Sequence, residues 1–394
     1  MTVEVPNTDQ LRVVGVGCGE PKKSMGWFHL QQMLGDPRLK FDAVVEPWFL
    51  GAGKEAPGSE AFAKFCEEMR AKHPDVLLCS STEELPMLRG PDDPPVLAVI
   101  AGRTCDAPKL FRGMCERGVS HIYLEKPGAE SAADLEDLAL LAREQGVAVV
   151  VGYNKNVSDY VQGALAQLEG MEDMSPTVVL EHNNAFDTDE DLLSFVRGPG
   201  AEGLVHNMCC HELALAATLF GVTRQRVHAV VLEPDESELF ELVAPKEDWR
   251  RVAYRLLLRD VEGSQQLPLA HRLPELRFVA NRSGGNFSQV RVTAQGQEER
   301  CFRLPSPEQE IEVRAAQAEG PEVRPYFFQQ ATDYQRLRGG FAQHILEGLP
   351  GTPPGVVDLR GAVETLRLAD MIAHALRECH QAGEPWLYPI PQTA

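Results

Sequence analysis

A lysine stands where an apolar run gives way to a turn. Residues 122–124 are Ile-Tyr-Leu, and Glu125, Lys126, Pro127 and Gly128 follow directly. In an open α/β sheet, ligands bind in the crevice outside the carboxyl ends of the strands. A proline that restricts the backbone there would hold the charge of Lys126 toward the bound ligand. An ammonium group in that place can stabilise negative charge on a substrate oxygen. The alternative interpretation is an ordinary surface lysine.

Glycines follow the first apolar run of the chain. The run Leu-Arg-Val-Val leads into Gly15, Gly17 and Gly19. Glycines after a strand let backbone N–H groups approach a phosphate at the start of the next helix. The first two match the G-x-G-x-x-G pattern of dinucleotide sites, but Glu20 takes the third place. We therefore expect a longer loop in which Gly26 opens the helix, with a plain tight turn as the alternative.

Glu46 ends the second predicted strand, residues 41–45. A carboxylate at this place accepts hydrogen bonds from both ribose hydroxyls of an adenosine and repels a 2′-phosphate. The residue therefore favours NAD, although Lys54 nearby leaves NADP possible. A solvated loop glutamate is the alternative.

The same glycines also match the G-x-G-x-G pattern of S-adenosylmethionine-dependent methyltransferases, which likewise carry an acidic residue after the second strand. Those enzymes usually have Asp or Glu just before the first glycine pair. Here Val13 and Val14 occupy that strand end, which counts against a methyltransferase.

Short apolar runs alternate with amphipathic stretches between residues 11 and 152. This alternation is typical of an α/β, doubly wound parallel sheet, so we predict a Rossmann-type dinucleotide-binding domain over residues 9–152. Ser131 begins a capping-box-like helix start. The predicted strands are residues 11–16, 41–45, 76–79, 96–100, 121–124 and 147–151, and the predicted helices include 59–72, 108–117 and 131–145.

The pattern changes after Gly152, where longer strands are separated by loops rich in proline, glutamate and glycine. We predict an α+β domain over residues 153–394, for substrate and oligomerisation, whose largely antiparallel sheet has helices on one face. Acidic segments at 234–248 and 305–325 show little pattern and are interpreted as surface insertions. The predicted strands are 177–182, 227–232, 252–258 and 288–294, and the predicted last helices are 327–346 and 358–381.

Bulk composition narrows the class of protein. A length of 394 residues fits two domains, and a net charge of −20 argues against nucleic acid or an anionic membrane as partner. The nine cysteines include no CxxC pair, and no stretch approaches the ~18 apolar residues of a membrane helix. Because residues 1–10 also lack a signal pattern, we expect a cytoplasmic protein, although a removed targeting segment would leave the compartment open.

Three motifs resemble the Gfo/Idh/MocA family, NAD(P)-dependent enzymes of the glucose-fructose oxidoreductase and inositol dehydrogenase type. They are Glu125-Lys126-Pro127, residues 151–155 (VGYNK) and residues 203–211 (GLVHNMCCH). The order of the two domains agrees, and the resemblance spans nearly the whole chain. It implies hydride transfer between NAD(P) and a small hydroxyl or carbonyl compound, such as a sugar, a polyol or a related ring compound. It also implies a homo-oligomer formed through the open sheet face.

The resemblance assigns roles to residues, with Lys126 contacting the substrate hydroxyl near the nicotinamide and His211 in the active site. Asn207 and Ala214 replace the two aspartates of the family's D-x-G-x-H-x-x-D motif, which bears on the reaction more than on the fold. Gly102 and Arg103 stand where the family has Thr-Pro. The expected cofactor-binding residues are Gly15, Gly17, Gly19, Gly26, Glu46, Gly102, Arg103, Glu125 and Lys126.

Hydride transfer from an alcohol needs a proton acceptor and a group that stabilises charge on the oxygen. An imidazole, with a pKa near ~6.5, suits His211 to acid/base work beside Lys126. Asn207 is the third predicted catalytic residue, because it precedes His211 by four residues, which is one helical turn. Its amide can orient a hydroxyl but cannot accept a proton. A buried core histidine is the alternative for His211.

Asn154, Lys155 and His206 are the predicted substrate-binding residues, and His206 is a rival acid/base. No metal is expected, because the adjacent Cys209 and Cys210 could not easily share one tetrahedral ion. Besides the dehydrogenase and the methyltransferase, two alternatives stay open. One is a catalytically silent NAD(P)-binding regulator, favoured by Asn207 and the interrupted glycine motif, and the other is an NAD-assisted glycosidase.

Overall fold

A computed structural model describes residues 10–90, 93–171, 175–198, 202–243, 246–260, 266–323 and 325–391. The chain forms two compact units. Met1–Asn154 and Val313–Ala362 make up the first, and Lys155–Glu312 and Val363–Ala394 make up the second. The expected domain of residues 153–394 differs from this division, because part of the C-terminal region returns to the first unit.

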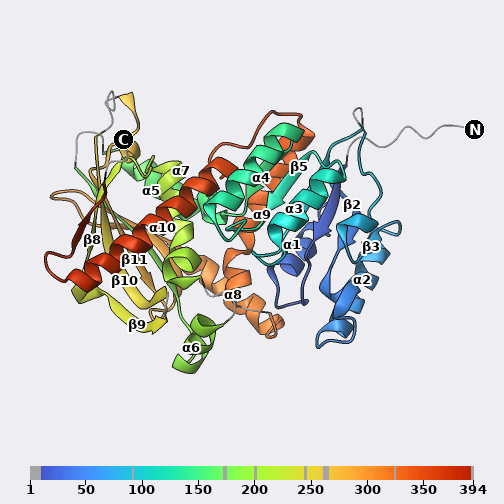
Figure 1. Cartoon of the computed structure of the whole chain (residues 1–394), viewed down its shortest axis with the longest axis horizontal. Coiled ribbons are helices and arrows are strands. Elements are labelled where there is room, and N and C mark those ends of the chain that lie inside the picture. Colours follow the sequence, from blue (N-terminus) through green and yellow to red (C-terminus); the bar gives the residue numbers. More distant parts are fainter. Residues whose placement is uncertain are drawn as a thin grey trace, which may run out of the picture. The chain divides into compact units, whose positions relative to one another are not determined.

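A sheet of six parallel strands forms the centre of the first unit (Figure 1). Its order, β3-β2-β1-β4-β5-β6, is that of a dinucleotide-binding fold, so the predicted fold class is confirmed. The strands are almost wholly apolar because helices cover both faces of such a sheet. They are β1 (Leu11–Val16), β2 (Leu39–Val45), β3 (Leu77–Cys79), β4 (Val96–Ile100), β5 (His121–Leu124) and β6 (Ala148–Val151).

The helices of the first unit alternate with these strands: α1 (Met25–Met33), α2 (Ser59–Lys72), α3 (Ala107–Glu116) and α4 (Ala132–Gln145). In α4 the Ser131 hydroxyl accepts a hydrogen bond from the backbone N–H of Asp134, and Gly146 ends the helix in the left-handed conformation. Both ends follow the usual capping chemistry, and the predicted capping start is confirmed. Short turns lie at Trp48–Ala52 and Thr82–Glu84.

Helix α9 (Pro325–Leu346) joins the first unit by contact with α1. Phe28 of α1 stacks on Phe327 of α9 with ring centroids 4.9 Å apart, and Tyr334 meets the Phe28 ring edge-on. These three aromatic residues are buried together. Aromatic burial of this size explains why residues 313–362 belong to the first unit rather than to the second.

The second unit contains a mixed sheet with strand order β13-β12-β7-β11-β10-β8-β14, and β9 pairs with β10. Strands β7 and β11 are parallel, and the other pairs among the described residues are antiparallel, as expected. The strands are β7 (Thr177–Asn184), β8 (Val227–Leu232), β9 (Glu238–Val243), β10 (Lys246–Leu258), β11 (Glu275–Asn281), β12 (Asn286–Thr293), β13 (Arg300–Leu304) and β14 (Leu387–Pro389).

Helices pack on one face of this sheet, where Tyr254 stacks on Phe278 with ring centroids 5.0 Å apart. The other face carries ion pairs. Arg277 contacts Glu233 at 2.7 Å, and Arg255 contacts Glu275 at 3.2 Å. The helices of this unit are α5 (Asp159–Glu169), α6 (Asp189–Arg197) and α7 (Cys210–Leu219), with short turns at Asn154–Val157, Val205–Cys209, Pro234–Glu236 and Leu269–Arg272. Helices α8 (Pro307–Glu319) and α10 (Leu359–Ala382) each have residues in both units.

The two acidic segments, interpreted as surface insertions, contain regular secondary structure that was not predicted. Residues 234–248 contain β9 and the start of β10, which pair antiparallel, and 305–325 contains helix α8. Backbone pairing within the sheet imposes strand structure there although the side chains show little alternation. Residues 244, 245 and 324 lie outside the described part. No helix among the described residues is long and apolar enough to cross a membrane.

Candidate active site

The glycine loop joins β1 to α1 at the carboxyl edge of the parallel sheet. Gly17 has a φ of +78°, and a Cβ added there would lie 2.6 Å from the Cα and N of Gly102. A Cβ on Gly26 would lie 1.9 Å from the Gly17 carbonyl oxygen. Gly26 is in the first turn of α1, as predicted for a lengthened loop. No side chain fits at these positions, so backbone alone lines the start of the helix, which is what a bound pyrophosphate requires.

Glu46 follows β2 and is buried at the side of this loop. Its Oε2 accepts a hydrogen bond from the Gly19 backbone N–H at 2.7 Å, and its Oε1 accepts one from Trp48 at 2.9 Å. The carboxylate is therefore held against the loop rather than solvated. Gly102 and Arg103 follow β4, and the exposed guanidinium of Arg103 pairs with Asp106 at 2.8 Å.

The Glu125-Lys126-Pro127 turn follows β5 at the same edge. Glu125 Oε2 lies 2.8 Å from Nε2 of His29 and accepts a hydrogen bond from the Tyr123 hydroxyl at 3.1 Å. A Cβ on Gly152 would lie 2.7 Å from that same carboxylate oxygen and from the Tyr123 hydroxyl. Glu125 is therefore held in place on several sides, and the backbone that carries Lys126 is held with it.

Arg338 of α9 completes this network. Its guanidinium donates to Nδ1 of His29 and to the Gln32 side chain. A guanidinium can only donate, so His29 accepts at Nδ1 and donates from Nε2 to Glu125. Burial, reinforced by Arg338, lowers the pKa of His29 to about 4 despite the opposing Glu125. The imidazole is therefore neutral at pH 7 and joins a buried cation to the carboxylate beside Lys126.

The second unit carries the other predicted catalytic residues. Asn207 lies in a wide helical turn, Val205–Cys209, and His211 in the first turn of α7. Wide turns of this kind are frequent at functional sites. His211 is 6% exposed, and its ring centroid lies 6.0 Å from that of His182 on β7. Lys126 belongs to the first unit.

Two predicted substrate-binding residues have polar partners inside the protein. Lys155 is buried, and its Nζ lies 2.6 Å from Oε1 of Glu212, the residue after His211. Asn154 is fully buried and donates to Gln330 of α9 at 3.2 Å. The third, His206, has its Nε2 2.8 Å from Asp370 of α10. None of these contacts followed from local sequence pattern.

Glu212 is the residue of this region that sequence reasoning missed. Burial opposes its ionisation, but Lys155 and His182 together lower its pKa to about 2. The carboxylate therefore stays charged inside the protein. Its position directly after His211 was the available signal, since a charged residue on an otherwise apolar helix face needs a buried partner.

Comparison with known proteins identifies the first unit. Residues 11–153 match the model of the GFO_IDH_MocA oxidoreductase family, described by its NAD-binding Rossmann fold. Over these residues the chain is similar to the Gfo/Idh/MocA family, and the resemblance seen in the sequence is confirmed for this NAD-binding part. No curated protein matches the chain.

Solved structures extend the likeness of fold to nearly the whole chain. A myo-inositol dehydrogenase from Corynebacterium glutamicum ATCC 13032 matches with a TM-score of 0.64 and 16% identity, over 98% of this chain and 100% of its own. A putative myo-inositol dehydrogenase from Sinorhizobium meliloti 1021 gives 0.64 and 15%, over 97% and 100%. A scyllo-inositol dehydrogenase from Lactobacillus casei, with bound NAD(H) and scyllo-inositol, gives 0.63 and 12%, over 97% and 99%. At these identities the likeness shows the shared fold.

The residues of the glycine loop fit the NAD of the Gfo/Idh/MocA family. A Cβ on Gly17 or Gly26 would clash, so backbone alone lines the start of α1, and Glu46 lies at the end of β2, where a ribose is bound in such folds. Bound there, NAD supplies the nicotinamide carbon that exchanges a hydride. No group of histidine, cysteine or acidic side chains in the described part could hold a metal ion.

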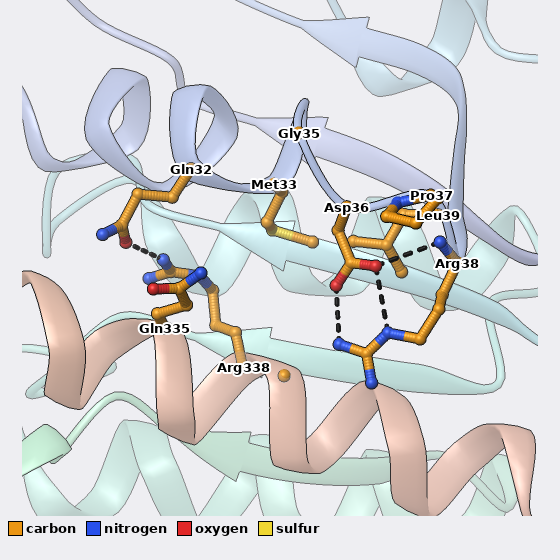
Figure 2. Close-up of a pocket in the computed structure, with 10 residues that line it drawn as sticks. Gln32, Met33, Gly35, Asp36, Pro37, Arg38, Leu39, Gln335 and Arg338 are labelled. Carbon is orange, nitrogen blue, oxygen red and sulfur yellow. Dashed lines mark hydrogen bonds and ion pairs between the residues drawn. The ribbon is translucent and has the colours of Figure 1, made fainter.

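A pocket of about 320 Å³ lies where α1 ends and β2 begins. Figure 2 shows the residues that line it. Gln32, Asp36, Arg38, Gln335 and Arg338 contribute to its lining. The strands are parallel, so this pocket lies at the amino edge of the sheet, opposite the glycine loop. It is therefore separate from the dinucleotide crevice of this Gfo/Idh/MocA unit.

Proposed function

We propose that this protein is an NAD(H)-dependent dehydrogenase that moves a hydride between the nicotinamide and a hydroxyl or carbonyl group of a small sugar, polyol or related ring compound. The observation that carries the proposal is the anchored turn of Lys126. Glu125 is held by His29 and Tyr123, at the sheet edge where the family binds NAD. A surface lysine would need no such buried support.

In this proposal Lys126 stabilises the oxygen of the reacting group and His211 exchanges its proton. Asn207 orients a substrate hydroxyl through its amide, because it cannot take up a proton as a carboxylate would. Gly15, Gly17, Gly19, Gly26, Gly102, Arg103 and Glu46 would hold the dinucleotide. Glu46 favours NAD over NADP, because its carboxylate repels a 2′-phosphate.

Substrate class is proposed from the inositol dehydrogenases that share the fold. The test is a panel of inositols, sugars and sugar lactones with NAD⁺, NADP⁺ and their reduced forms, followed at the nicotinamide absorbance. Lys126→Met and His211→Gln are expected to lower turnover at least ~100-fold while NADH affinity stays within about threefold. Lys109→Met, at an exposed position of α3, is the matched control and should behave as wild type.

Full turnover in both variants would contradict the site assignment. NADH binding without turnover on the whole panel would instead support a catalytically silent regulator. Asn207, in place of the family's aspartate, motivates that second candidate. Binding of S-adenosylmethionine but not of NAD(H) would overturn both.

We also propose a homo-oligomer formed through the open face of the second unit's sheet. Val179, Ala253 and Val279 form a small apolar cluster on that face, among the ion pairs of Arg255 and Arg277. All three are already buried beneath these charged side chains, so a second copy would cover a largely charged face, and the proposal rests on the resemblance to the family. Light scattering after size exclusion should give a mass above one chain, and a monomer at micromolar concentration would contradict this proposal.

A cytoplasmic location is part of the proposal and is supported by the cysteines. None of the nine, all of which lie in the described part of the chain, forms a disulfide, and Cys105 and Cys301 are exposed. Exposed thiols of this kind persist in a reducing compartment. Fractionation of the cells that make the protein tests the location.

A further inference from the structure

A row of buried polar groups in the second unit leads from Lys155 through Glu212 to His182. Glu212 Oε1 pairs with Lys155, and Oε2 lies 3.2 Å from Nδ1 of His182. The side chains of Lys155 and Glu212 are 2% and 4% exposed, whereas that of His182 is 13% exposed. The row therefore begins in the interior and ends at a group that solvent reaches.

The partners of Nδ1 determine the tautomer of His182. This nitrogen lies 3.2 Å from the Met208 carbonyl oxygen as well as 3.2 Å from the Glu212 carboxylate. Both partners can only accept, so Nδ1 carries the proton. A neutral imidazole then has its lone pair on Nε2, which makes no hydrogen bond with the described residues. This is the arrangement in which a carboxylate orients a catalytic histidine.

The surroundings keep His182 neutral near pH 7. Burial lowers its pKa, Lys155 lowers it further, and Glu212 and the Met208 carbonyl oppose them. Its neighbours along the sheet, Ala280 of β11 and Ser288 of β12, carry no charge. Across from it, on the first turn of α7, lies His211. The groups that can tune its titration are therefore Lys155, Glu212 and His211.

We propose that His182 is a second acid/base residue of the site, oriented by Glu212 and Lys155, which supplies the proton acceptor that Asn207 cannot be. This inference rests on the proposed dehydrogenase. In the oxidative direction the substrate O–H bond breaks, His211 takes up its proton, and Nε2 of His182 accepts the proton from His211 in turn. The hydride that the carbon loses as its C=O bond forms would pass to bound NAD⁺, so one substrate hydroxyl would yield one carbonyl. The proton then leaves to solvent.

The first test measures the tautomer and the pKa of His182 in the protein without cofactor or substrate. Nitrogen-15 NMR of the histidine rings, with His182→Gln for assignment, should show the Nδ1-protonated tautomer at pH 7. In Glu212→Gln the pKa of His182 should fall, because the carboxylate is the charge that favours the imidazolium. An Nε2-protonated ring, or a pKa unmoved by Glu212→Gln, overturns the proposal.

The second test uses turnover. His182→Gln should lower kcat roughly 100-fold at pH 7 and remove the acid limb of the kcat/KM profile, with NADH affinity unchanged. His228→Gln, at an exposed position of β8, is the matched control and should keep both the rate and the profile. A His182→Gln variant with the wild-type profile overturns the proposal. If wild type turns over no compound of the panel, the proposed function fails by itself, and the NMR result still decides whether His182 is arranged as a proton acceptor.

Discussion

His29 Nε2 lies 2.8 Å from Glu125 Oε2, although the two residues are 96 positions apart in the chain. The contact joins the first helix to the turn that carries Lys126. Arg338 approaches the same imidazole from a helix near the other end of the chain. The position of the proposed catalytic lysine therefore depends on three segments that only the folded protein brings together.

Protonation of His29 should destabilise the protein in mild acid. Burial, with Arg338, lowers the pKa of His29 to about 4, against 6.5 for the free side chain. As the pH falls, the His29 side chain of the unfolded chain is protonated before that of the folded protein. The contribution of neutral His29 to the free energy of unfolding is therefore complete above pH 6.5 and is lost as the pH falls toward 4. The free energy of unfolding should be lower by about 2–3 kcal/mol at pH 4.5 than at pH 7. Urea unfolding at pH 7 and 4.5 measures it.

His29→Gln should flatten that pH dependence without abolishing it, because burial also lowers the pKa of His121 to about 4. An unchanged slope in His29→Gln would show that the imidazole is not buried against Arg338.

Arg338→Met should cost about 2–4 kcal/mol of the free energy of unfolding, because it leaves Gln32, His29 and Glu125 without their buried cation. Gln335→Met is the control on the same helix, at an exposed position, and should change stability by no more than ~0.5 kcal/mol. Denaturant unfolding of both variants at pH 7 gives the comparison. Equal stability of the two would mean that the buried network contributes nothing.

Gly17→Ala should weaken NADH binding at least ~10-fold and destabilise the protein by ~1–3 kcal/mol, since its φ is +78° and the new Cβ would overlap the Gly102 backbone. Gly340→Ala is the control for replacing a glycine elsewhere in the first unit. That position is exposed in the middle of α9 with open space around it, so alanine should stabilise by ~0.5–1 kcal/mol and leave binding unchanged. Fluorescence titration with NADH and thermal unfolding report both effects. Wild-type affinity in Gly17→Ala would remove the loop from the cofactor site.

Lys155→Met should be strongly destabilising, by about 3–5 kcal/mol, because it leaves the Glu212 carboxylate buried beside an uncharged side chain. Replacing both residues, Lys155→Met with Glu212→Met, should recover part of that loss. A double-mutant cycle by urea unfolding measures the coupling, and additive effects would show that the pair is not coupled.

The Lys155–Glu212 pair should also affect how the free energy of unfolding depends on pH in acid. The pKa of Glu212 is lowered from 4.5 to about 2, so its contribution is present above pH 4.5 and is lost as the pH falls through 2. The stability of Glu212→Gln should therefore change less over that range than that of wild type.

Local pattern was enough to predict much of the fold. The strands of the first unit are short apolar runs bounded by turn residues, and Ser131 with Asp134 predicted the start of α4. The strand in 234–248 and the helix in 305–325 were missed because their side chains show little periodicity: β9 pairs with the adjacent β10, and α8 buries no residue. The return of α9 to the first unit was missed because Phe28 and Phe327 are far apart in sequence.

The sequence by itself determined the order of strands and helices, the glycines at the end of β1, and the motif residues Lys126 and His211. These depend on the types and spacing of neighbouring residues, which set backbone conformation and the periodicity of apolar side chains. Only the tertiary structure decided what surrounds them: the His29–Glu125 contact, the burial of Lys155 against Glu212, and the orientation of His182. The reason is electrostatic. A buried charge or imidazole requires a partner in space, and nothing in the spacing along the chain specifies which distant residue will be that partner.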